Sequence, residues 1–390
     1  MKQIITNILD LDLYKLSMLQ AFYNQYPTAT GRWEFKCRNK DVKLGFLKDQ
    51  VREQLDMMKG LHLENGDRIK LLNKAPFLSY EFLSWFQKDF RLNPDLVTVS
   101  EKDGDLLISA EGFLIDVNIF EVFILAIVNE LYFEDMMEGY DYDTIEEVGN
   151  MRLDEKIKML KEYPNLVFAE FGTRRRFSKD WQDWVVGRLA KECPNAIGTS
   201  NVLLAIKHDL KPIGTVAHEF QMAHLGLVER IEQAQSRALH VWRQEYGDQL
   251  GIALSDTFTT DAFLRDFDFS VARAYDGVRH DSGDPISFGH KMINHYKSIG
   301  IDPRRKTIIF SDGLTVQKAI KIWKEFAGLI SISFGIGTHF SNDCSLPTLN
   351  IVMKLMECND IPCVKISDEP GKAMGDPDMI RKVKKAYMVK

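Results

Sequence analysis

The stretch TIIFSDGLTVQKAIKIWKEFAGLISISFGIGTHF, residues 307–340, holds the alternation on which the fold depends. It begins with a short apolar run and a polar turn. It then places Val316, Ile320 and Trp323 at spacings of three and four, which is typical of an amphipathic helix. A second apolar run and a glycine-containing turn follow. A strand, a helix and a second strand in this order predict a βαβ unit in a parallel sheet.

The same alternation recurs from about residue 165 onward. Seven short apolar runs lie at residues 166–171, 196–198, 212–216, 251–254, 277–279, 307–310 and 330–334. Helical spacing appears between them, as at Trp181, Trp184, Val185 and Leu189. Seven units of this kind predict an α/β fold with an irregular seven-stranded barrel, closed or nearly closed, rather than an open sheet.

The turns after these runs carry side chains suited to chemistry. They are FGTRRR (171–176), GTSN (198–201), GTVAHEF (214–220), SDTF (255–258), RHDSGD (279–284), SDG (311–313) and GIGTHF (335–340). In α/β barrels, ligands and catalytic groups lie on the loops that follow the carboxyl ends of the strands. One polar turn would be an ordinary helix cap, whereas seven in the same topological position predict a site.

The first third of the chain has a different pattern. Apolar spacing over residues 10–26 predicts a helix that ends before Pro27. Residues 31–38 alternate like a strand, and residues 106–119 suggest two short strands around Gly112. No linker rich in Gly, Ser or Pro and no sequence repeat marks a domain boundary.

The composition excludes several classes of protein. The chain has 390 residues, of which 45% are hydrophobic and 27% charged, as in globular rather than disordered proteins. Its net charge of −6 gives no basic field for nucleic acid, so an anionic ligand needs local positive charge. The longest apolar stretch, residues 119–133, contains Glu121, Asn129 and Glu130 and is too short to span a membrane. Five cysteines without a CxxC pair predict reduced thiols in a cytoplasmic protein.

Two of the turns have features that favour anions. Residues 171–176 end in three arginines. An arginine run is commonly a solvated patch, but positive charge at a helix N-terminus opposes the macrodipole and becomes favourable when an anion is bound. The glycines of residues 335–338 resemble a phosphate-binding turn at a helix start, although they form neither a GxGxxG nor a Walker motif.

Carboxylates and one histidine make up a second set of candidates. Asp281 is of a type common in ordinary turns, but it lies near Arg279 in the sequence. Asp256 and Asp312 occupy matching positions after neighbouring strands. Carboxylates that converge on one barrel mouth suit Mg²⁺. A single histidine is usually structural, but His218 follows a strand end among the other turns and is therefore a candidate for catalysis.

As a set, these motifs resemble those of nicotinate phosphoribosyltransferases. The similar segments follow the expected order along nearly the whole chain: DLYK (12–15), EFGTRRR (170–176), IGTSN (197–201), GTVAHE (214–219), RHDSGD (279–284), FSDG (310–313), FGIGT (334–338) and SDEPGK (367–372). The resemblance implies a type II phosphoribosyltransferase fold with the irregular barrel over residues 126–344. It also implies an α/β sandwich formed by residues 1–125 and completed by 345–390, and a homodimer with shared active sites.

The implied reaction joins nicotinate to 5-phosphoribosyl-1-diphosphate, giving nicotinate mononucleotide and diphosphate as the first step of NAD salvage from nicotinate. The resemblance further implies that ATP is a co-substrate, hydrolysed through a phosphohistidine at His218, which makes the enzyme a ligase. Catalytic roles then fall to His218, Arg279 and Asp281. The implied substrate contacts are Tyr14 of the partner subunit on the pyridine ring, Arg174, Arg175 and Thr215 in the pocket, and Asp312, Gly313, Gly337 and Thr338 at the 5′-phosphate.

Ser200 distinguishes this interpretation from its nearest alternative, a nicotinamide phosphoribosyltransferase. The resemblance implies that nicotinamide-using relatives carry an aspartate at this position. A carboxylate about 4 Å from nicotinate would cost roughly 4 kcal/mol at an effective dielectric of about 20, whereas a serine hydroxyl donates to the substrate carboxylate.

Three further alternatives remain open. Quinolinate-decarboxylating relatives share the barrel, but their chains are shorter and lack this set of turns. An RNA-binding module built on residues 174–176 would need a broader basic surface with interleaved aromatic residues. Another phosphate-binding barrel enzyme, such as an aldolase or isomerase, would typically carry a lysine or glutamate at a strand end.

Overall fold

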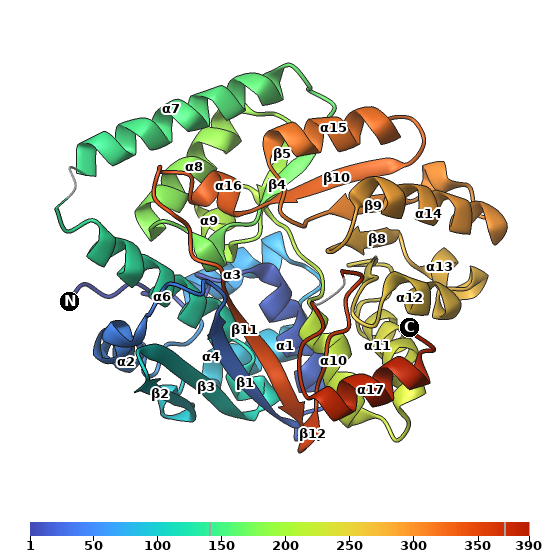
Figure 1. The fold of residues 1–390 in the computed structure, drawn as a ribbon, viewed down its shortest axis with the longest axis horizontal. Helices are drawn as coiled ribbons and strands as arrows, with labels where there is room; N and C mark the ends of the chain where they lie inside the picture. Colours follow the sequence, from blue (N-terminus) through green and yellow to red (C-terminus); the bar gives the residue numbers. More distant parts are fainter. Residues whose placement is uncertain (140–141, 370–371, 390) are drawn as a thin grey trace.

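The computed structural model describes residues 1–139, 142–369 and 372–389. Pro370 and Gly371 of the SDEPGK segment lie outside the described residues. A seven-stranded sheet has the order β6-β5-β4-β10-β9-β8-β7, and all its pairs are parallel. A five-stranded antiparallel sheet of order β12-β11-β1-β3-β2 lies below it in the view of Figure 1.

The seven parallel strands confirm the predicted fold class and all seven units. They are β4 Phe168–Glu170, β5 Ala196–Thr199, β6 Lys211–Pro212, β7 Ile252–Leu254, β8 Gly277–His280, β9 Thr307–Phe310 and β10 Ser331–Ile336. The chain enters at β4 in the middle, moves out to β6, and returns from β7 at the other edge to β10, which pairs with β4. In the described part of the chain no ladder joins β6 to β7, so the sheet is a curled half-barrel with two edges.

The strand at the β6 edge is shorter than the predicted run of residues 212–216. Only Lys211–Pro212 pairs, because the chain turns away at Gly214, where φ is 155°. A Cβ on Gly214 would lie 3.1 Å from the backbone nitrogen of Tyr14, so the loop passes close to the first helix. The loop then delivers His218 to the start of the next helix.

Helices of the βα units lie outside the curled sheet (Figure 1). Ser178, Asn201, Asp284 and Thr315 each cap a helix by accepting a hydrogen bond from the N–H three residues later. Some of the polar residues that follow the strands are therefore ordinary helix N-caps. The helices are α7 Tyr142–Lys161, α8 Lys179–Glu192, α9 Val202–Lys207, α10 His218–Leu227, α11 Ala234–Tyr246, α12 Thr260–Asp266, α13 Phe269–Ala274, α14 Pro285–Ser298, α15 Val316–Phe326 and α16 Thr338–Ser341, with 3₁₀ turns η3 Thr173–Arg175, η4 Ile231–Gln233 and η5 Pro303–Arg305.

The antiparallel sheet joins the first third of the chain to its C-terminal segment, which confirms the predicted sandwich. Its strands are β1 Thr30–Cys37, β2 Val97–Lys102, β3 Asp105–Phe113, β11 Ile351–Cys358 and β12 Ile361–Pro362. β1 is central and pairs with β3 on one side and β11 on the other. The remaining elements are α1 Leu13–Gln25, α2 Lys48–Met57, α3 Asn65–Lys74, α4 Tyr80–Lys88, α5 Leu114–Val117, α6 Phe120–Met136 and α17 Pro377–Ala386, with η1 Gly45–Leu47 and η2 Pro94–Leu96. The boundaries at residues 125 and 344 stay predictions.

The prediction of two short strands within residues 106–119 is wrong. One strand, β3, continues through Gly112 to Phe113, and helix α5 follows. Gly112 sits in the ladder opposite Gly31 of β1, so the glycine that suggests a turn in the sequence is instead a strand residue. A Cβ on Gly31 would lie 2.5 Å from Leu114 Cδ2, so this close approach depends on glycine at that position.

Two helices form the apolar interior next to the sheets. The helix predicted over residues 10–26 is α1, whose residues 13–22 are all buried. The long apolar stretch of residues 119–133 lies in α6, which is buried from Phe120 to Phe133. Helices that are apolar on every side belong in a core. None of the helices in the described ranges is long and apolar enough to cross a membrane.

Candidate functional site

Four polar side chains from four parts of the chain form what we call the His218 cluster: His218, Asp256, Asp281 and Lys365. His218 opens α10, Asp256 and Asp281 follow β7 and β8, and Lys365 comes from the C-terminal segment. His218 Nε2 lies 2.8 Å from Lys365 Nζ, 2.9 Å from Asp256 Oδ1 and 3.6 Å from Asp281 Oδ2. Lys365 Nζ is also 2.8 Å from Asp256 Oδ2. The ring nitrogen Nε2 therefore faces a cation and two carboxylates.

Burial controls the charge state of His218. Loss of solvent, helped by the positive charge of Lys365, lowers the pKa of His218 to about 4. Burial disfavours an ionised Asp256, but the contacts with His218 and Lys365 hold the pKa of this carboxyl well below its ordinary value. The imidazole is thus neutral near pH 7 while the carboxylate beside it stays ionised. A neutral imidazole has an unprotonated ring nitrogen, which is the nucleophile that attack on phosphorus requires.

Arg279 is fixed beside this cluster by groups from neighbouring strand ends. Its Nε donates to Ser311 Oγ at 3.0 Å, its Nη1 donates to the Val216 carbonyl at 3.1 Å, and its Nη2 lies 3.0 Å from Asp281 Oδ1. Burial opposes ionisation of Asp281, yet Arg279 holds the pKa of that carboxyl well below its ordinary value. The guanidinium is therefore oriented before any ligand arrives.

Arg174 and Tyr14 form a second group of polar side chains. The Arg174 guanidinium lies 5.6 Å from the Tyr14 ring centroid, and its Nη1 is 3.3 Å from Glu121 Oε1. Lys15 Nζ lies 2.6 Å from Glu121 Oε2 and also contacts Glu219. Burial raises the pKa of Glu121, but Lys15 and Arg174 outweigh it and lower that pKa to about 2. Arg174 therefore keeps a carboxylate partner in this structure.

Tyr14 lies near Arg174 of its own chain, at the start of α1, where the Leu13 N–H donates to the Ser200 carbonyl at 2.8 Å. The sequence interpretation assigned this tyrosine to the site of a neighbouring subunit. The contact within one chain does not test that assignment, which stays a prediction.

Ser200 is paired with a carboxylate of the protein in this structure. Its hydroxyl donates to Asp12 Oδ1 at 2.6 Å, and the residue is fully buried. Burial raises the pKa of Asp12 despite Arg174 and Ser200. In this arrangement the donor expected to meet a substrate carboxylate is already used by a carboxylate of the protein.

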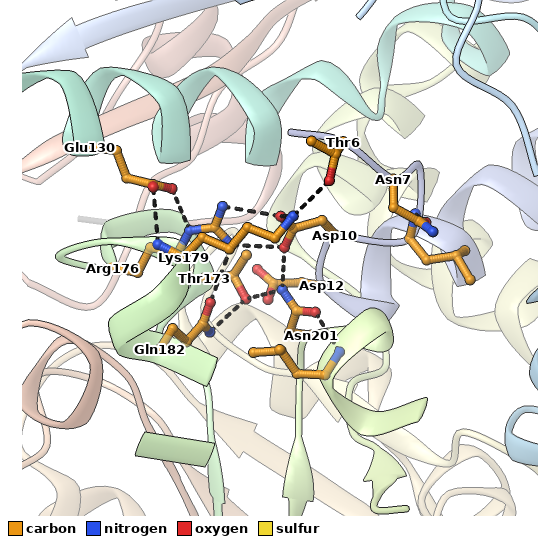
Figure 2. Close-up of polar contacts among 12 residues, drawn as sticks. Thr6, Asn7, Asp10, Asp12, Glu130, Thr173, Arg176, Lys179, Gln182 and Asn201 are labelled. Carbon is orange, nitrogen blue, oxygen red and sulfur yellow. Dashed lines mark hydrogen bonds and ion pairs between the residues drawn. The ribbon is translucent and has the colours of Figure 1, made fainter. Parts of the chain in front are cut away.

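The three arginines of residues 174–176 separate into different environments, so they do not form one anion site. Arg175 Nη2 donates to Asn350 Oδ1 at 3.3 Å and to the Ile351 carbonyl at 3.2 Å, and burial lowers the pKa of Arg175 to about 10. Arg176 points inward and is completely buried. Figure 2 shows it between Asp10 and Glu130. Its Nη1 lies 2.7 Å from Asp10 Oδ1, and its Nε lies 2.7 Å from Glu130 Oε1. We call Arg176, Asp10 and Glu130 the Arg176 cluster.

The remaining predicted contacts lie on the expected loops. Thr215 is partly exposed, and its carbonyl accepts a hydrogen bond from Ser17 Oγ at 2.6 Å. Asp312 is partly exposed with a pKa raised by burial, and Gly313 next to it is exposed at a φ of 52°. Gly337 and Thr338 open α16, and a Cβ on Gly337 would lie 2.7 Å from the Phe171 carbonyl oxygen. No direct contact in the described part joins these residues to the His218 cluster.

Sequence reasoning missed Lys365 and Lys354 as site residues. Lys354 lies on β11 near Arg174, Lys365, Glu121 and Glu219, and burial lowers its pKa to about 8. Among the described residues no hydrogen bond or ion pair engages its ammonium group. The signal available in the sequence was a lysine between apolar residues of a strand, where burying the charge is costly unless it has a partner or a ligand.

The two groups together suit an anionic ligand. Arg174, Arg279, Lys354 and Lys365 bring positive charge to the carboxyl end of the half-barrel, in a chain whose net charge is −6. The ligand atoms of His218, Asp256 and Asp281 lie within 4.8 Å of one another, so this set could hold a metal ion. The two carboxylates are the kind of ligand that Mg²⁺ prefers, and phosphates complete such sites.

Comparisons with known proteins agree on a family. Residues 166–390 match the nicotinate phosphoribosyltransferase (NAPRTase) family, and residues 9–129 match the NAPRTase N-terminal domain. A nicotinate phosphoribosyltransferase of Chromobacterium violaceum is 44% identical over 382 residues, which cover 95% of this chain and 94% of the relative. The crystal structure of the nicotinate phosphoribosyltransferase from Porphyromonas gingivalis has a TM-score of 0.93 at 37% identity, covering 99% of this chain and 100% of that one. The Vibrio cholerae structure gives 0.93 at 38% identity, covering 100% and 94%.

Proposed function

Since this chain belongs to the nicotinate phosphoribosyltransferase family, we propose that it forms nicotinate mononucleotide and diphosphate and couples this transfer to ATP hydrolysis through a phosphohistidine. The reaction would be the first step of NAD salvage from nicotinate. The observation that carries the coupling is the buried, neutral His218, whose Nε2 lies 2.8 Å from the ammonium group of Lys365.

The transfer step needs no nucleophile from the protein. The pyridine nitrogen of nicotinate attacks C1 of the phosphoribosyl donor, the C1–oxygen bond breaks, and diphosphate leaves with the electron pair. Pyridine nitrogen carries no proton, so a general base is unnecessary. The residues of the chain orient the reactants and stabilise the leaving group. Arg279 is suited to that task because Ser311 and Val216 already hold its guanidinium in place.

The ATP step uses His218 as a nucleophile. Its Nε2 attacks the γ-phosphorus of ATP, a nitrogen–phosphorus bond forms, and the bond to the departing ADP oxygen breaks. Water later hydrolyses the phosphohistidine and releases phosphate. Lys365 lies where it can stabilise the added negative charge, and this charge alters the electrostatics of the adjacent Arg279–Asp281 pair.

Mg²⁺ is the proposed cofactor, and Asp256 and Asp281 are the residues that would hold it. Their carboxylates fit a hard cation, although Lys365 and Arg279 now neutralise them. When bound with the substrate phosphates, Mg²⁺ would offset negative charge on the leaving group.

One assay tests the proposed function against its alternatives. Diphosphate release is measured with nicotinate or nicotinamide, each with and without ATP. We expect release with nicotinate and stimulation by ATP. Faster turnover of nicotinamide would indicate a nicotinamide phosphoribosyltransferase. Release with neither base would leave a phosphate-binding enzyme of another class.

We also propose a cytoplasmic homodimer. Every cysteine in the chain is a free thiol in this structure, which suits a reducing compartment. Mixing Tyr14→Ala chains with His218→Ala chains, neither of which should carry out ATP-coupled transfer, tests whether sites are shared. Recovery of ATP-coupled activity after subunit exchange would show that Tyr14 serves the neighbouring site, whereas no recovery despite proven exchange would count against a shared site.

A further inference from the structure

Glu170, the last residue of β4, is a buried carboxyl group with no role in the reaction described above. It is 1% exposed. Its Oε1 accepts a hydrogen bond from the Gly172 backbone N–H at 2.6 Å, and its Oε2 accepts one from Thr199 Oγ1 at 2.5 Å. Gln182 Nε2 from α8 donates to both oxygens, at 3.1 and 3.3 Å. Four donor contacts therefore converge on one carboxyl group.

These donors belong to the two loops that hold the proposed nicotinate contacts. Gly172 immediately precedes the 3₁₀ turn that presents Arg174, and Thr199 precedes Ser200. The backbone of Ser200 is fixed as well, because its N–H donates to the Glu170 carbonyl at 2.8 Å. Gly172 cannot be replaced easily, since a Cβ there would lie 2.6 Å from Glu170 Oε1. One residue thus sets the spacing between the two loops.

A wider hydrogen-bond network supports this link. Thr173 accepts from Gln182 Nε2 at 3.1 Å and from Asn201 Nδ2 at 3.3 Å, and Asn201 Nδ2 also donates to Asp10 at 2.8 Å. Figure 2 shows dashed lines joining Thr173, Gln182 and Asn201, with Asp10 bonded to Asn201. A movement of the loop that contains Gly172 therefore affects the residues at the ends of both β4 and β5.

The charges around Glu170 do not favour its ionised form. Its direct partners on β5 and α8 are neutral, and the N-terminal segment brings Asp12 and Asp10 toward it. Arg176, the cation nearest in the network, is engaged by Asp10 and Glu130. Burial, with a smaller contribution from Asp12, raises the pKa of Glu170 to about 7 despite the hydrogen bonds it accepts. Asp10, which has Arg176 beside it, has a lowered pKa instead.

We propose that Glu170 is a positioning residue whose ionised form holds the Arg174 and Ser200 loops together and whose protonation releases them, so that affinity for nicotinate falls as the pH drops below neutrality. Protonation turns one carboxyl oxygen into a donor. With the proton on Oε2, the Thr199 hydroxyl can rotate to accept from it, and the Gly172 N–H then donates to an uncharged Oε1. A charge-assisted hydrogen bond to the loop is thereby replaced by a weaker neutral one. The choice of nicotinate as ligand rests on the proposed function, whereas the coupling of the two loops does not.

The first experiment measures nicotinate binding by calorimetry between pH 6 and 8. If only the ionised form binds, the wild-type Kd rises about tenfold from pH 8 to pH 6 for a group with a pKa of about 7. The side chain in Glu170→Gln is neutral at every pH, so we expect this variant to bind nicotinate weakly, with a Kd that does not change between pH 6 and 8. Glu130→Gln is the matched control: Glu130 is a buried carboxyl on Arg176 and does not touch Gly172 or Thr199. We expect this control to keep the wild-type dependence.

The second experiment does not depend on the substrate. Hydrogen exchange of the Gly172 amide, corrected for its intrinsic pH dependence, reports the bond to Glu170 in the free protein. Protection should fall below about pH 7 in the wild type, and Thr199→Val should raise this midpoint by removing a donor that stabilises the ionised form. A protein that binds no nicotinate but shows this exchange behaviour would contradict the proposed function alone. Unchanged exchange midpoints, or wild-type pH dependence of binding in Glu170→Gln, would overturn the inference about Glu170.

Discussion

The Arg176 cluster and the His218 cluster contain similar side chains but differ in how far solvent can reach their charges. In the Arg176 cluster the side chains of Arg176, Asp10 and Glu130 are 0%, 1% and 8% exposed, and each group finds its partner inside the cluster. In the His218 cluster the side chains of Lys365 and Asp281 keep 12% and 22% of their surface in contact with solvent. A buried ion-pair group that solvent cannot reach is costly to break, whereas charge that is positioned but still accessible can bind a ligand.

The largest effect is expected from removing the centre of the Arg176 cluster. Arg176→Met leaves two buried carboxylates without their cation, which costs about 3–5 kcal/mol of unfolding free energy. Urea unfolding followed by circular dichroism measures this loss. Arg304→Met is the control, because that arginine is exposed and its guanidinium pairs with Asp302, two residues away in the sequence. Equal stability of both variants would contradict the structural role of the Arg176 cluster.

Arg279→Ala tests the opposite behaviour at the other cluster. The variant should fold normally but lose about 2–5 kcal/mol of transition-state stabilisation, because it removes a charged donor from the anion site. Steady-state measurement of kcat/KM with nicotinate and the phosphoribosyl donor reports this loss. As a control for folding, the variant should unfold at the same temperature as the wild type. A near-wild-type kcat/KM would show that Arg279 has no role in the mechanism.

His218→Ala separates ATP coupling from phosphoribosyl transfer. We expect no ATP hydrolysis and no ATP stimulation, with slow ATP-independent formation of nicotinate mononucleotide remaining. Incorporation of ³²P from γ-labelled ATP checks the phosphohistidine directly. Acid-labile label in the variant would place it on another histidine. His224 is a poor substitute, because its two ring nitrogens face the Phe220 carbonyl and the Tyr26 hydroxyl.

The pKa of His218 adds a pH test in the wild type. Because that pKa is lowered to about 4, the imidazole stays neutral from pH 8 down to about pH 5 and becomes protonated only below that range. Phosphohistidine formation should therefore show no loss attributable to His218 between pH 6 and 8. A loss of labelling with a midpoint near the ordinary histidine pKa of about 6.5 would contradict the buried, neutral state.

Much of the fold could be predicted because its signals are local. Each strand of the half-barrel is a short apolar run followed by a turn, and the helix spacing of Val316, Ile320 and Trp323 identifies α15 without any long-range information. The prediction of two strands around Gly112 fails because a glycine suggests a turn when the partner strand is not known. The opposing Gly31 is more than seventy residues away in the sequence.

The site was harder to predict because its residues depend on pairing across distant segments. His218, Arg279 and Asp281 come together as the turns suggested. The sequence could not show that Ser200 donates to Asp12, that Arg176 faces inward, or that Lys365 reaches His218 from the C-terminal segment. Each of these contacts depends on which charged side chain the fold places next to the residue. The local spacing of residues in the sequence does not show this.

Lys354 gives the smallest expected effect and tests whether positive charge at the site extends to the antiparallel sheet. Lys354→Met should raise the KM for the phosphoribosyl donor about fivefold, equivalent to ~1 kcal/mol for a partly solvated ion pair. The lysine is charged below its pKa of about 8, so the wild-type KM should rise as the pH passes above 8. Lys354→Arg stays charged and should remove that rise, while Lys354→Met should have a high KM throughout. Lys36→Met, on the exposed part of β1, is the control and should follow the wild type. If Lys354→Met follows the wild type as well, the cationic site ends at the loops of the half-barrel, and the antiparallel sheet only supports it.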